Sequence, residues 1–544
     1  MGIRARWRLS RAKHHSLAGH PRIAKLLAKL APFYEYSGEE FFASDGVPPD
    51  VVRRRRAAFE RLAGRLAQCA PQTLHATETL KPHVPDLQFT SRYRVPFQYS
   101  RVVQQHLKVG AFVGESNGVV LQDLDGNAAY DLAGSYGVNV FGYDFYKECI
   151  EAAVDRVKQL GPVLGAYHPL IEENVRALKA ISGLEQVSFH MSGTEAVMQA
   201  VRLARYHTGR SHLVRFAGAY HGWWDDVQPG IGTPGKVTGV YTLSEMNDHT
   251  LAVLRTRKDI ACVLVNPLQA LHPNCSAPSD ATLVASDRAA GMDRAGYAAW
   301  LNALREVCTS RSIVLIFDEV FVGFRIAYGG AQEYFGVRAD MVTYGKTLGG
   351  GLPVGVLCGK SALMKRFRDD RPTDICFARG TFNSHPYVMA TMHEFLRRTD
   401  NPATRACYEH TDKVWTDRCA ALNARLGAER LPVRVANLSS IWTVWYVTPS
   451  RYNWMFQFYL RAEGLALSWV GTGRLIFSHN YTDDDFAAVA ERFVAAARSM
   501  HEDGWWWQSP ALTNRAIAHQ ILWEMLRVTI GSKSSPRSTY SGDL

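Results

Sequence analysis

Asp318 and Lys346 are the two residues of this chain whose types and positions best suit chemistry. Asp318 directly follows the apolar stretch 313–317 within FDEVFVGFR (317–325), and Lys346 lies in the glycine-rich segment TYGKTLGGGLPVG (343–355). A lysine amine can form a Schiff base with pyridoxal phosphate, while a carboxylate can keep the pyridine nitrogen protonated so that the ring accepts electrons. The pair therefore predicts a pyridoxal phosphate site.

Each half of this pair has another interpretation when it is taken alone. An Asp-Glu pair after a strand is also typical of a metal-binding acidic turn, and a lysine beside glycines is often a solvated loop residue. Other segments of the chain must decide between these interpretations.

A phosphate site is predicted in MSGTEAVMQAVRLAR (191–205). Ser192 and Glu195 have the spacing of a capping box at a helix start. Small and apolar residues then repeat at helical intervals, at Ala196, Ala200, Val201 and Ala204. The free N–H groups and positive dipole end of such a helix suit a phosphate at Ser192, Gly193 and Thr194. An ordinary capped helix is the alternative.

The segment FAGAYHGWWDD (216–226) places an aromatic residue beside a histidine in a glycine-rich turn. Tyr220 could lie flat on a heterocycle, although a tyrosine in such a position is more often part of the core. This segment is informative only together with the others.

In order and spacing, these four segments resemble the class III (subgroup II) aminotransferases of fold type I, and especially the glutamate-1-semialdehyde aminomutases. The resemblance runs from about residue 119 to residue 496. It includes further short segments, DLDGN (123–127), GVNVFG (137–142), GTFNSHP (380–386) and FSHNYTDDDF (477–486).

The resemblance implies a role for each matching residue. Lys346 would be the Schiff-base lysine and Asp318 the partner of the pyridine nitrogen. Val320 would pack on one face of the ring and Tyr220 would stack on the other. Three residues would hold the phosphate, Ser192, Gly193 and Thr194. Thr381 would add a contact from the neighbouring subunit, which implies a homodimer.

The chain departs from the family pattern after the strand that precedes the aspartate strand. The family usually has Glu-Pro there, whereas this chain has Asn266 and Pro267 in LVNPLQALHPN (264–274). Any role of that glutamate therefore does not carry over to this chain.

The fold expected from the sequence is α/β, with the mostly parallel central sheet of a fold type I PLP-dependent transferase. Short apolar stretches alternate with helical patterns, at 187–190, 213–216, 262–266 and 313–317. With 544 residues and 47% hydrophobic content, the chain can bury more than one core. After residue 391 we expect a helix, strands at 440–447 and 475–477, and a helix from Asp483.

These patterns predict five regions. They are a basic N-terminal extension (1–100), the N-terminal part of a small domain (101–160), a large PLP-binding α/β domain (161–390), a C-terminal small domain (391–504) and a C-terminal tail (505–544). The tail contains a predicted helix around 517–528, and its last dozen residues have the composition of a disordered segment.

The formal charge of +11 is concentrated near the N-terminus. Residues 1–30 contain eight basic residues and no acid, namely Arg4, Arg6, Arg8, Arg11, Lys13, Arg22, Lys25 and Lys29. Within 20–34, four apolar residues share one face of a predicted helix, Ile23, Leu26, Leu27 and Leu30. Docking of this face on the protein's own body is the preferred expectation.

Contact of the basic N-terminus with an anionic membrane surface or an acidic acyl carrier protein is the alternative. No motif supports nucleic-acid binding. The nine cysteines are scattered without a C-x-x-C pair, which is typical of cytosolic thiols and of neither a disulfide framework nor a zinc site. No stretch has 18 uninterrupted apolar residues, so we expect a soluble, cytoplasmic protein.

The expected reaction is transfer of an amino group from an amino-acid donor to an aldehyde or ketone. The segments QALHPN, QFYLRAEGLALSW (457–469) and IFSHNYT also resemble aminotransferases of polyketide and fatty-acyl secondary metabolism, whose acceptors are acyl-derived. Five aromatic residues could line an apolar pocket or belong to the core, Tyr136, Phe141, Trp223, Trp224 and Trp469. Arg474 is a candidate for binding a substrate carboxylate.

Two alternatives stay open on the sequence alone. An intramolecular aminomutase, an isomerase like the semialdehyde enzyme, would need no separate amino donor. A regulatory protein that binds the cofactor without turnover is disfavoured, because Lys346 and Asp318 are both present. Release of a keto acid from the donor distinguishes the transaminase from the aminomutase.

Overall fold

The computed structural model describes residues 2–14, 17–92, 95–228, 230–233, 235, 238–271, 291–469 and 471–531. Within them, a seven-stranded sheet has the order β4 (Gln186–His190), β10 (Gly355–Gly359), β9 (Met341–Gly345), β8 (Val314–Asp318), β7 (Ile260–Val265), β5 (His212–Phe216) and β6 (Val240–Leu243). Strands β9, β8, β7, β5 and β6 are parallel, and β10 is antiparallel to both of its neighbours. The predicted mostly parallel sheet is therefore confirmed.

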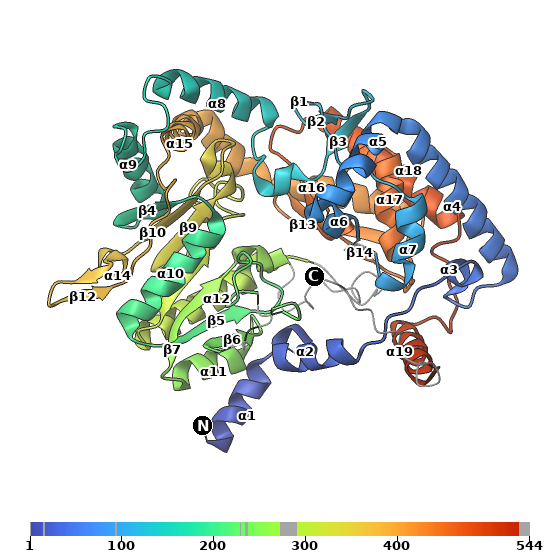
Figure 1. The fold of residues 1–544 in the computed structure, drawn as a ribbon, viewed down its shortest axis with the longest axis horizontal. Helices are drawn as coiled ribbons and strands as arrows, with labels where there is room; N and C mark the ends of the chain where they lie inside the picture. The colour runs from blue at the N-terminus through green and yellow to red at the C-terminus, as the bar shows by residue number, and fades with distance from the viewer. Residues whose placement is uncertain are drawn as a thin grey trace.

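Helices cover this sheet, as Figure 1 shows. Every residue of β7, β8 and β9 is buried, which explains their continuous apolar sequences. Helix α10 (Gly193–Thr208) packs on β7, β9 and β10, and α12 (Arg294–Ser310) packs on β8. The small residues predicted on one face of α10 are all fully buried, Ala196, Ala200, Val201 and Ala204.

Two smaller sheets join segments that are far apart in the sequence. β15 (Leu465–Ala466) pairs in parallel with β3 (Ala128–Asp131), which continues to β2 (Val120–Gln122) and β1 (Glu115–Asn117). The other sheet has the order β13 (Val433–Leu438), β14 (Ile441–Tyr446) and β16 (Leu475–Ile476). Helices α16 (Pro402–Ala428) and α18 (Asp483–Glu502) pack together beside it.

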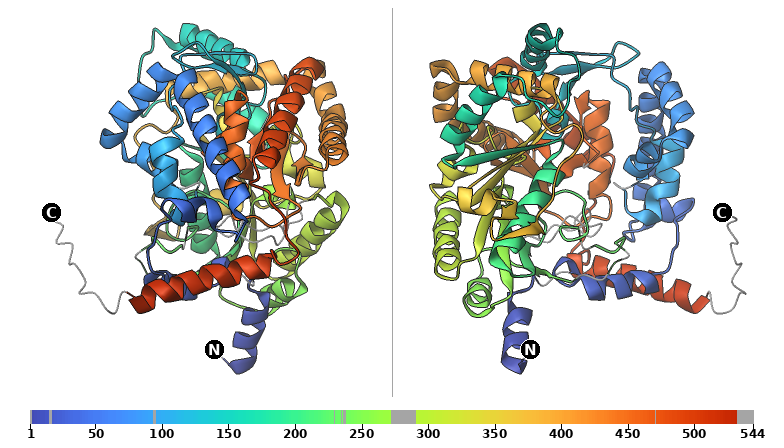
Figure 2. Two further views of the ribbon diagram at one scale, coloured as in Figure 1. Left: turned by 90° about the vertical axis from the view of Figure 1, so that its right-hand side faces the viewer. Right: turned by 60° about the vertical axis from the view of Figure 1, so that its left-hand side comes forward.

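The N-terminal extension packs against this C-terminal part. Its helices are α3 (Glu39–Ala43), α4 (Pro49–Cys69), α5 (Pro71–Leu80), α6 (Pro85–Arg92) and α7 (Phe97–His106). Figure 2 shows them beside the C-terminal helices, and Phe41, Phe59 and Trp505 share one hydrophobic cluster.

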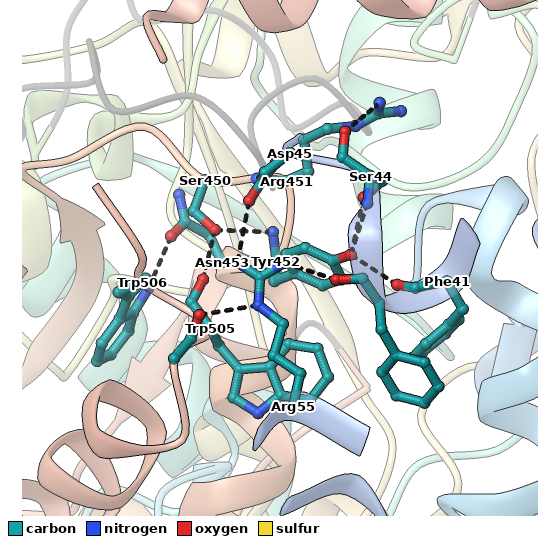
Figure 3. A network of polar contacts seen from close by, with 12 residues as sticks. Phe41, Ser44, Asp45, Arg55, Ser450, Arg451, Tyr452, Asn453, Trp505 and Trp506 are labelled. Carbon is teal, nitrogen blue, oxygen red and sulfur yellow. Dashed lines mark hydrogen bonds and ion pairs between the residues drawn. The ribbon is translucent and has the colours of Figure 1, made fainter. Parts of the chain in front are cut away.

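Buried polar contacts fix the extension to the tail (Figure 3). The Arg55 guanidinium donates to Gly504 O at 2.8 Å and lies 4.4 Å from the centre of the Tyr452 ring. The Tyr452 hydroxyl donates to Phe41 O at 2.6 Å. Arg55 also pairs with Asp45 at 3.4 Å. The segment around residue 505 is therefore part of a packed core.

The helix predicted within 20–34 forms as α2 (Pro21–Leu30), but its docking was predicted wrongly. Ala24 is its one buried residue, while Ile23, Leu26, Leu27 and Leu30 are 50%, 60%, 45% and 66% exposed. Lys25 donates to the backbone carbonyls of Thr233 and Gly235, so the helix rests on the body by its polar side. The apolar face is turned outward.

The remaining terminal helices are α1 (Ile3–Ala12) and α19 (Asn514–Gly531). Residues 532–544, predicted to be disordered, lie outside the described residues. Among the helices that the structure describes, none is long and apolar enough to cross a bilayer.

Candidate active site

Lys346 lies where the chain leaves the carboxyl end of β9, an edge at which α/β sheets commonly bind ligands. Its φ of +47° is in the left-handed region, which costs a residue with a Cβ about 1 kcal/mol. Burial lowers the pKa of the Lys346 amine; the charge of Asp318 opposes this shift and that of Arg325 adds to it. A neutral amine is therefore easier to obtain, as a nucleophile or base requires.

Asp318 is the buried last residue of β8, and three groups hold its carboxylate. His221 Nδ1 lies 2.7 Å from Oδ2, and Oδ1 accepts hydrogen bonds from the Thr343 hydroxyl and the Val320 N–H, both at 3.2 Å. Burial lowers the pKa of His221, and the hydrogen bond to Asp318 opposes this shift. A neutral His221 ring that carries its proton on Nδ1 can donate a hydrogen bond to Oδ2 of the Asp318 carboxylate.

Glu319 does not join Asp318 in an acidic metal-binding turn. Its carboxylate accepts hydrogen bonds from Ala331 N at 2.6 Å and Gln332 N at 3.1 Å, at the start of α13 (Gly330–Phe335). In the described part of the chain, no three His, Cys, Asp or Glu side chains are grouped to hold a metal ion. The alternative interpretation of the Asp-Glu pair therefore has no structural support.

The segment predicted to bind phosphate starts α10. Ser192 is the N-cap, and its hydroxyl accepts from Glu195 N at 3.2 Å. The Glu195 carboxylate accepts from Met191 N at 2.9 Å, one residue before the position that a capping box requires. The predicted box is therefore incomplete, because the chain turns so that the Met191 N–H is the one that faces Glu195.

Two glycines allow the start of α10 and the end of β9 to lie close to Val320, in the loop after Asp318. A Cβ on Gly193 would lie 2.6 Å from Val320 Cγ1, and one on Gly345 would lie 3.1 Å from the same atom. Val320 therefore lies between the start of α10 and the strand that ends before Lys346. A Cβ on Gly222 would collide with Thr194, so the loop after Tyr220 also touches this helix start.

Tyr220 lies in the loop after β5, with a side chain that is 61% exposed. Burial of its hydroxyl raises the pKa of Tyr220, and the charge of Asp318 adds to the shift. Asn266, in the position of the family glutamate, donates to Tyr220 O at 3.0 Å and accepts from Leu268 N at 3.1 Å. Asn266 thus ties the end of β7 to the Tyr220 loop.

Thr381 is exposed in the turn between β12 (Arg371–Ile375) and α15 (Pro386–Thr399). Within the described single chain, no hydrogen bond or ion pair joins it to the other predicted site residues. The structure thus brings seven of the predicted residues to one edge of the sheet, Ser192, Gly193, Thr194, Tyr220, Asp318, Val320 and Lys346. Thr381 stays separate.

Sequence reasoning gave no role to His221, Thr343 or Gly137. Thr343 is the register partner of Asp318 on the neighbouring strand, a pairing that needs the strand order. A Cβ on Gly137, whose φ is +97°, would lie 2.6 Å from Phe321 Cε2 and 3.3 Å from Lys346 Cδ. The one usable signal was the Tyr-His-Gly sequence at 220–222, which already placed a histidine beside a proposed ring contact.

The five aromatic residues considered for a pocket separate into three groups. Phe141 packs on Phe145 and Phe395, and Trp224 packs beside the hydrophobic cluster over α10, so both serve the core. Tyr136 and Trp223 are exposed, and Trp469 packs on Phe89 of the N-terminal extension at 5.7 Å. Arg474 directly precedes β16.

Comparison with known proteins agrees with this geometry. Residues 101–496 match the aminotransferase class-III family, and the chain belongs to it. It is 33% identical over 404 residues to a glutamate-1-semialdehyde 2,1-aminomutase of Nitratidesulfovibrio vulgaris (strain DP4), which covers 70% of this chain and 90% of that protein.

Solved structures with the same fold include a transaminase with PLP bound, with TM-score 0.60, 26% identity, and coverage of 76% of this chain and 94% of that one. Another is a glutamate-1-semialdehyde aminomutase from Pseudomonas aeruginosa PAO1, with TM-score 0.66, 18% identity, and coverage of 82% and 99%. The second likeness concerns the fold alone.

These findings confirm the predicted class III family, the fold type I architecture and a PLP-dependent enzyme of amino transfer. The residues at the sheet edge also fit the cofactor. Lys346, whose amine burial makes easier to deprotonate, offers an amine, and the buried Asp318 held by His221 offers a carboxylate. The start of α10, where Gly193 has no side chain, offers N–H groups to a phosphate.

Proposed function

We propose that Lys346, Asp318 and residues 192–194 hold pyridoxal phosphate, with Tyr220 and Val320 on the two faces of its ring. Bound there, the cofactor would supply an electron sink for the bonding electrons of a substrate Cα–H. The enzyme would move an amino group from an amino-acid donor to an aldehyde or ketone acceptor.

Asp318, Lys346 and the start of α10 would each have a separate role in this reaction. Asp318, ionised and hydrogen-bonded by His221 and Thr343, would hold a proton on the pyridine nitrogen. The amine of Lys346, whose pKa burial lowers, would carry the proton away from Cα and return it at the acceptor carbon. The start of α10 would hold the phosphate and orient the ring.

The acceptor is proposed from the side chains around the site. Tyr136, Tyr220 and Trp223 are exposed aromatic residues near the sheet edge. The observation that carries the proposal is that two nearby arginines, the buried Arg325 and the partly buried Arg461, are hydrogen-bonded to backbone carbonyls. Arg325 donates to Phe477 O and Asn139 O at 2.7 Å, and Arg461 donates to the backbone carbonyls of residues 467 and 468 at 3.0 Å.

Arginines that are engaged with the backbone have fewer N–H groups to offer a substrate carboxylate. Together with the aromatic residues, this supports an acceptor that carries a hydrocarbon chain, as an acyl-derived aldehyde or ketone does. The amino donor and this acceptor are the small-molecule partners of the proposed reaction.

An intramolecular aminomutase is the second candidate. It is supported by the name of relatives that are 33% and 34% identical to the chain and of which it covers 90%. Such an enzyme would move the amino group within one molecule and would release no keto acid from a separate donor.

The test uses the full chain supplied with pyridoxal phosphate. Amino-acid donors are mixed with aldehydes of increasing chain length, or with glutamate-1-semialdehyde alone, and the keto acid and amine products are measured. We expect donor-dependent release of keto acid and kcat/KM that rises with chain length. Conversion of the semialdehyde without a donor would instead establish the aminomutase. Lys346→Ala is the control and should lose either activity.

A further inference from the structure

The two ends of the chain expose apolar helix faces that a folded protein normally covers. On α19, Leu522, Trp523, Leu526 and Ile530 are all exposed, and Trp523 reaches 64%. They are spaced three or four residues apart along the helix, at 522, 526 and 530 and at 523 and 526, so they share one face. On α2, Ile23, Leu26, Leu27 and Leu30 are exposed in the same way. We call these eight residues the α2–α19 surface.

Both helices lie along the same edge of the molecule. Figures 1 and 2 show α2 and α19 at the lower side, away from α8 (Tyr143–Val157) and α9 (Leu170–Ser182) at the opposite side. The segment that follows α2 contacts α19 directly, because the Tyr34 hydroxyl donates to the Glu524 carboxylate at 2.9 Å. Phe33, between the two helices, is also exposed. The two apolar faces therefore belong to one side of the protein.

The exposed charges of residues 1–30 and of α19 have one sign. Residues 1–30 contain no aspartate or glutamate, and Arg4, Arg6, Arg11, Arg22 and Lys29 are exposed. On α19, Arg515 and Arg527 are exposed. The only acid of that helix, Glu524, points inward to Arg451 at 2.8 Å. Apolar side chains are thus flanked by cations without a matching acid on either helix.

We propose that the α2–α19 surface binds an anionic lipid bilayer, with its apolar side chains at the boundary of headgroups and acyl chains. An apolar helix face flanked by arginine and lysine is the pattern of helices that lie in a membrane interface. Trp523 on α19 and Trp7 on α1, which is exposed as well, are the residue type enriched at that depth.

Other occupants satisfy the observations less well. A second copy of the chain would bring cations against cations. An acidic carrier protein would match the charges but leave large apolar side chains in water. Both helices lie outside residues 101–496, so this surface is separate from the shared aminotransferase body. The proposal is therefore independent of the reaction proposed above.

Vesicle flotation of the full-length protein tests this inference. Vesicles contain either equal parts of phosphatidylglycerol and phosphatidylcholine or phosphatidylcholine alone. Two double variants, Leu26→Glu with Leu30→Glu and Trp523→Glu with Leu526→Glu, place acids at exposed positions of each helix. The matched control is Val154→Glu with Val414→Glu, at exposed positions of α8 (Tyr143–Val157) and α16. Thermal unfolding and cofactor absorbance show that each variant is folded.

We expect wild type and control to float with the anionic vesicles only, and each helix variant to bind at least about tenfold more weakly. Binding should also weaken as salt rises to about 1 M, where the screening length falls to about 3 Å. Absence of wild-type flotation, or unchanged flotation of both helix variants, would overturn the proposal. So would a change of oligomeric state in the variants, or binding to an acidic carrier protein that depends on these same residues without any binding to vesicles.

Discussion

His221 Nδ1 lies 2.7 Å from Asp318 Oδ2, and both side chains are buried. The contact joins the loop after β5 to the last residue of β8, 97 residues away in the sequence. The hydrogen bond fixes the orientation of the Asp318 carboxylate. Burial lowers the pKa of His221, and the neutral imidazole can donate this hydrogen bond from Nδ1 while the carboxylate stays ionised. We infer that His221 is a positioning residue for Asp318, the acid proposed above to hold the pyridine nitrogen.

His221→Phe should lower the rate of the half-reaction with the amino donor by about 10- to 100-fold, since a hydrogen bond to a charged group contributes about 1.5–3 kcal/mol. Cofactor affinity should change less, because the phosphate cradle is untouched. Single-turnover absorbance over a range of pH measures both. Thr343→Val, which removes a longer 3.2 Å hydrogen bond, should have a smaller effect. An unchanged rate and pH profile in His221→Phe would exclude the positioning role.

Asp318→Asn should slow removal of the Cα proton by orders of magnitude while the protein still binds the cofactor. The amide cannot act as the charged partner of a ring cation, so the transition state loses several kcal/mol of support, on the order of 3 kcal/mol or more. The measurement is the primary isotope effect and rate with a Cα-deuterated donor. A near wild-type rate would show that Asp318 does not contact the pyridine nitrogen.

Thr381 should act in the site of a neighbouring subunit, because it is exposed and no hydrogen bond or ion pair joins it to the other predicted site residues in the described single chain. We predict a homodimer at micromolar concentration. Mixing inactive Lys346→Ala subunits with an inactive Thr381→Ala variant, after dissociation and reassembly, should restore part of the activity through one repaired site. Sedimentation measures the dimer. A stable, active monomer would contradict the prediction.

The places of Asp318 and Ser192 in the fold could be predicted because local sequence determines them. Asp318 follows a run of apolar residues that had to be a buried strand, and Ser192 starts a strongly periodic helix, so their places on the sheet edge follow from short segments. The contact between His221 and Asp318 could not be predicted, because it depends on the order β8, β7, β5 in the sheet. Sequence periodicity does not contain that order.

The docking of α2 was predicted wrongly for a related reason. Helical periodicity shows that Ile23, Leu26 and Leu30 share a face, but it does not show which face meets the protein. Lys25 decides the orientation by bonding to carbonyls at residues 233 and 235, more than two hundred positions away. Hydrogen bonds between residues this far apart cannot be predicted from the local sequence.

Arg451 should hold α19 on the body of the protein. Its guanidinium is buried and pairs with both oxygens of Glu524 at 2.8 and 3.0 Å. Arg451→Met leaves the Glu524 carboxylate without its ion partner and should cost about 2–4 kcal/mol of docking free energy. Hydrogen exchange of residues 514–531 should then rise strongly. Arg515→Met, at an exposed position of the same helix, is the control.

The same pair gives α19 a dependence on pH. Burial acts to raise the pKa of Glu524, but the hydrogen bond and charge of Arg451 and the tyrosine hydroxyls lower it overall. Because the folded pKa is lowered, this contribution is present above the carboxyl's ordinary pKa of 4.5 and is lost as pH falls through the folded value. Protection of α19 from exchange, corrected for the intrinsic pH dependence of amide exchange, that does not change between about pH 5 and 3 would contradict this.

Glu245 should make stability fall as pH rises. Burial raises the pKa of Glu245 from 4.5 to about 8, opposed by the Tyr297 hydroxyl, which donates to it at 2.9 Å. The native state therefore binds this proton more tightly than the unfolded chain. Between those two values, wild type should lose stability with a slope approaching about 1.4 kcal/mol per pH unit.

Glu245→Gln removes this titration without changing the size of the side chain. The Tm of the variant relative to wild type should thus rise steadily from about pH 5 to pH 8 and stay constant above that range. Tm is measured at constant ionic strength with the cofactor bound. Tyr297→Phe serves as the matched change, because loss of its donated hydrogen bond should raise the pKa of Glu245 further and extend the decline to higher pH. A difference in Tm between Glu245→Gln and wild type that does not vary with pH would show that Glu245 ionises normally in the fold.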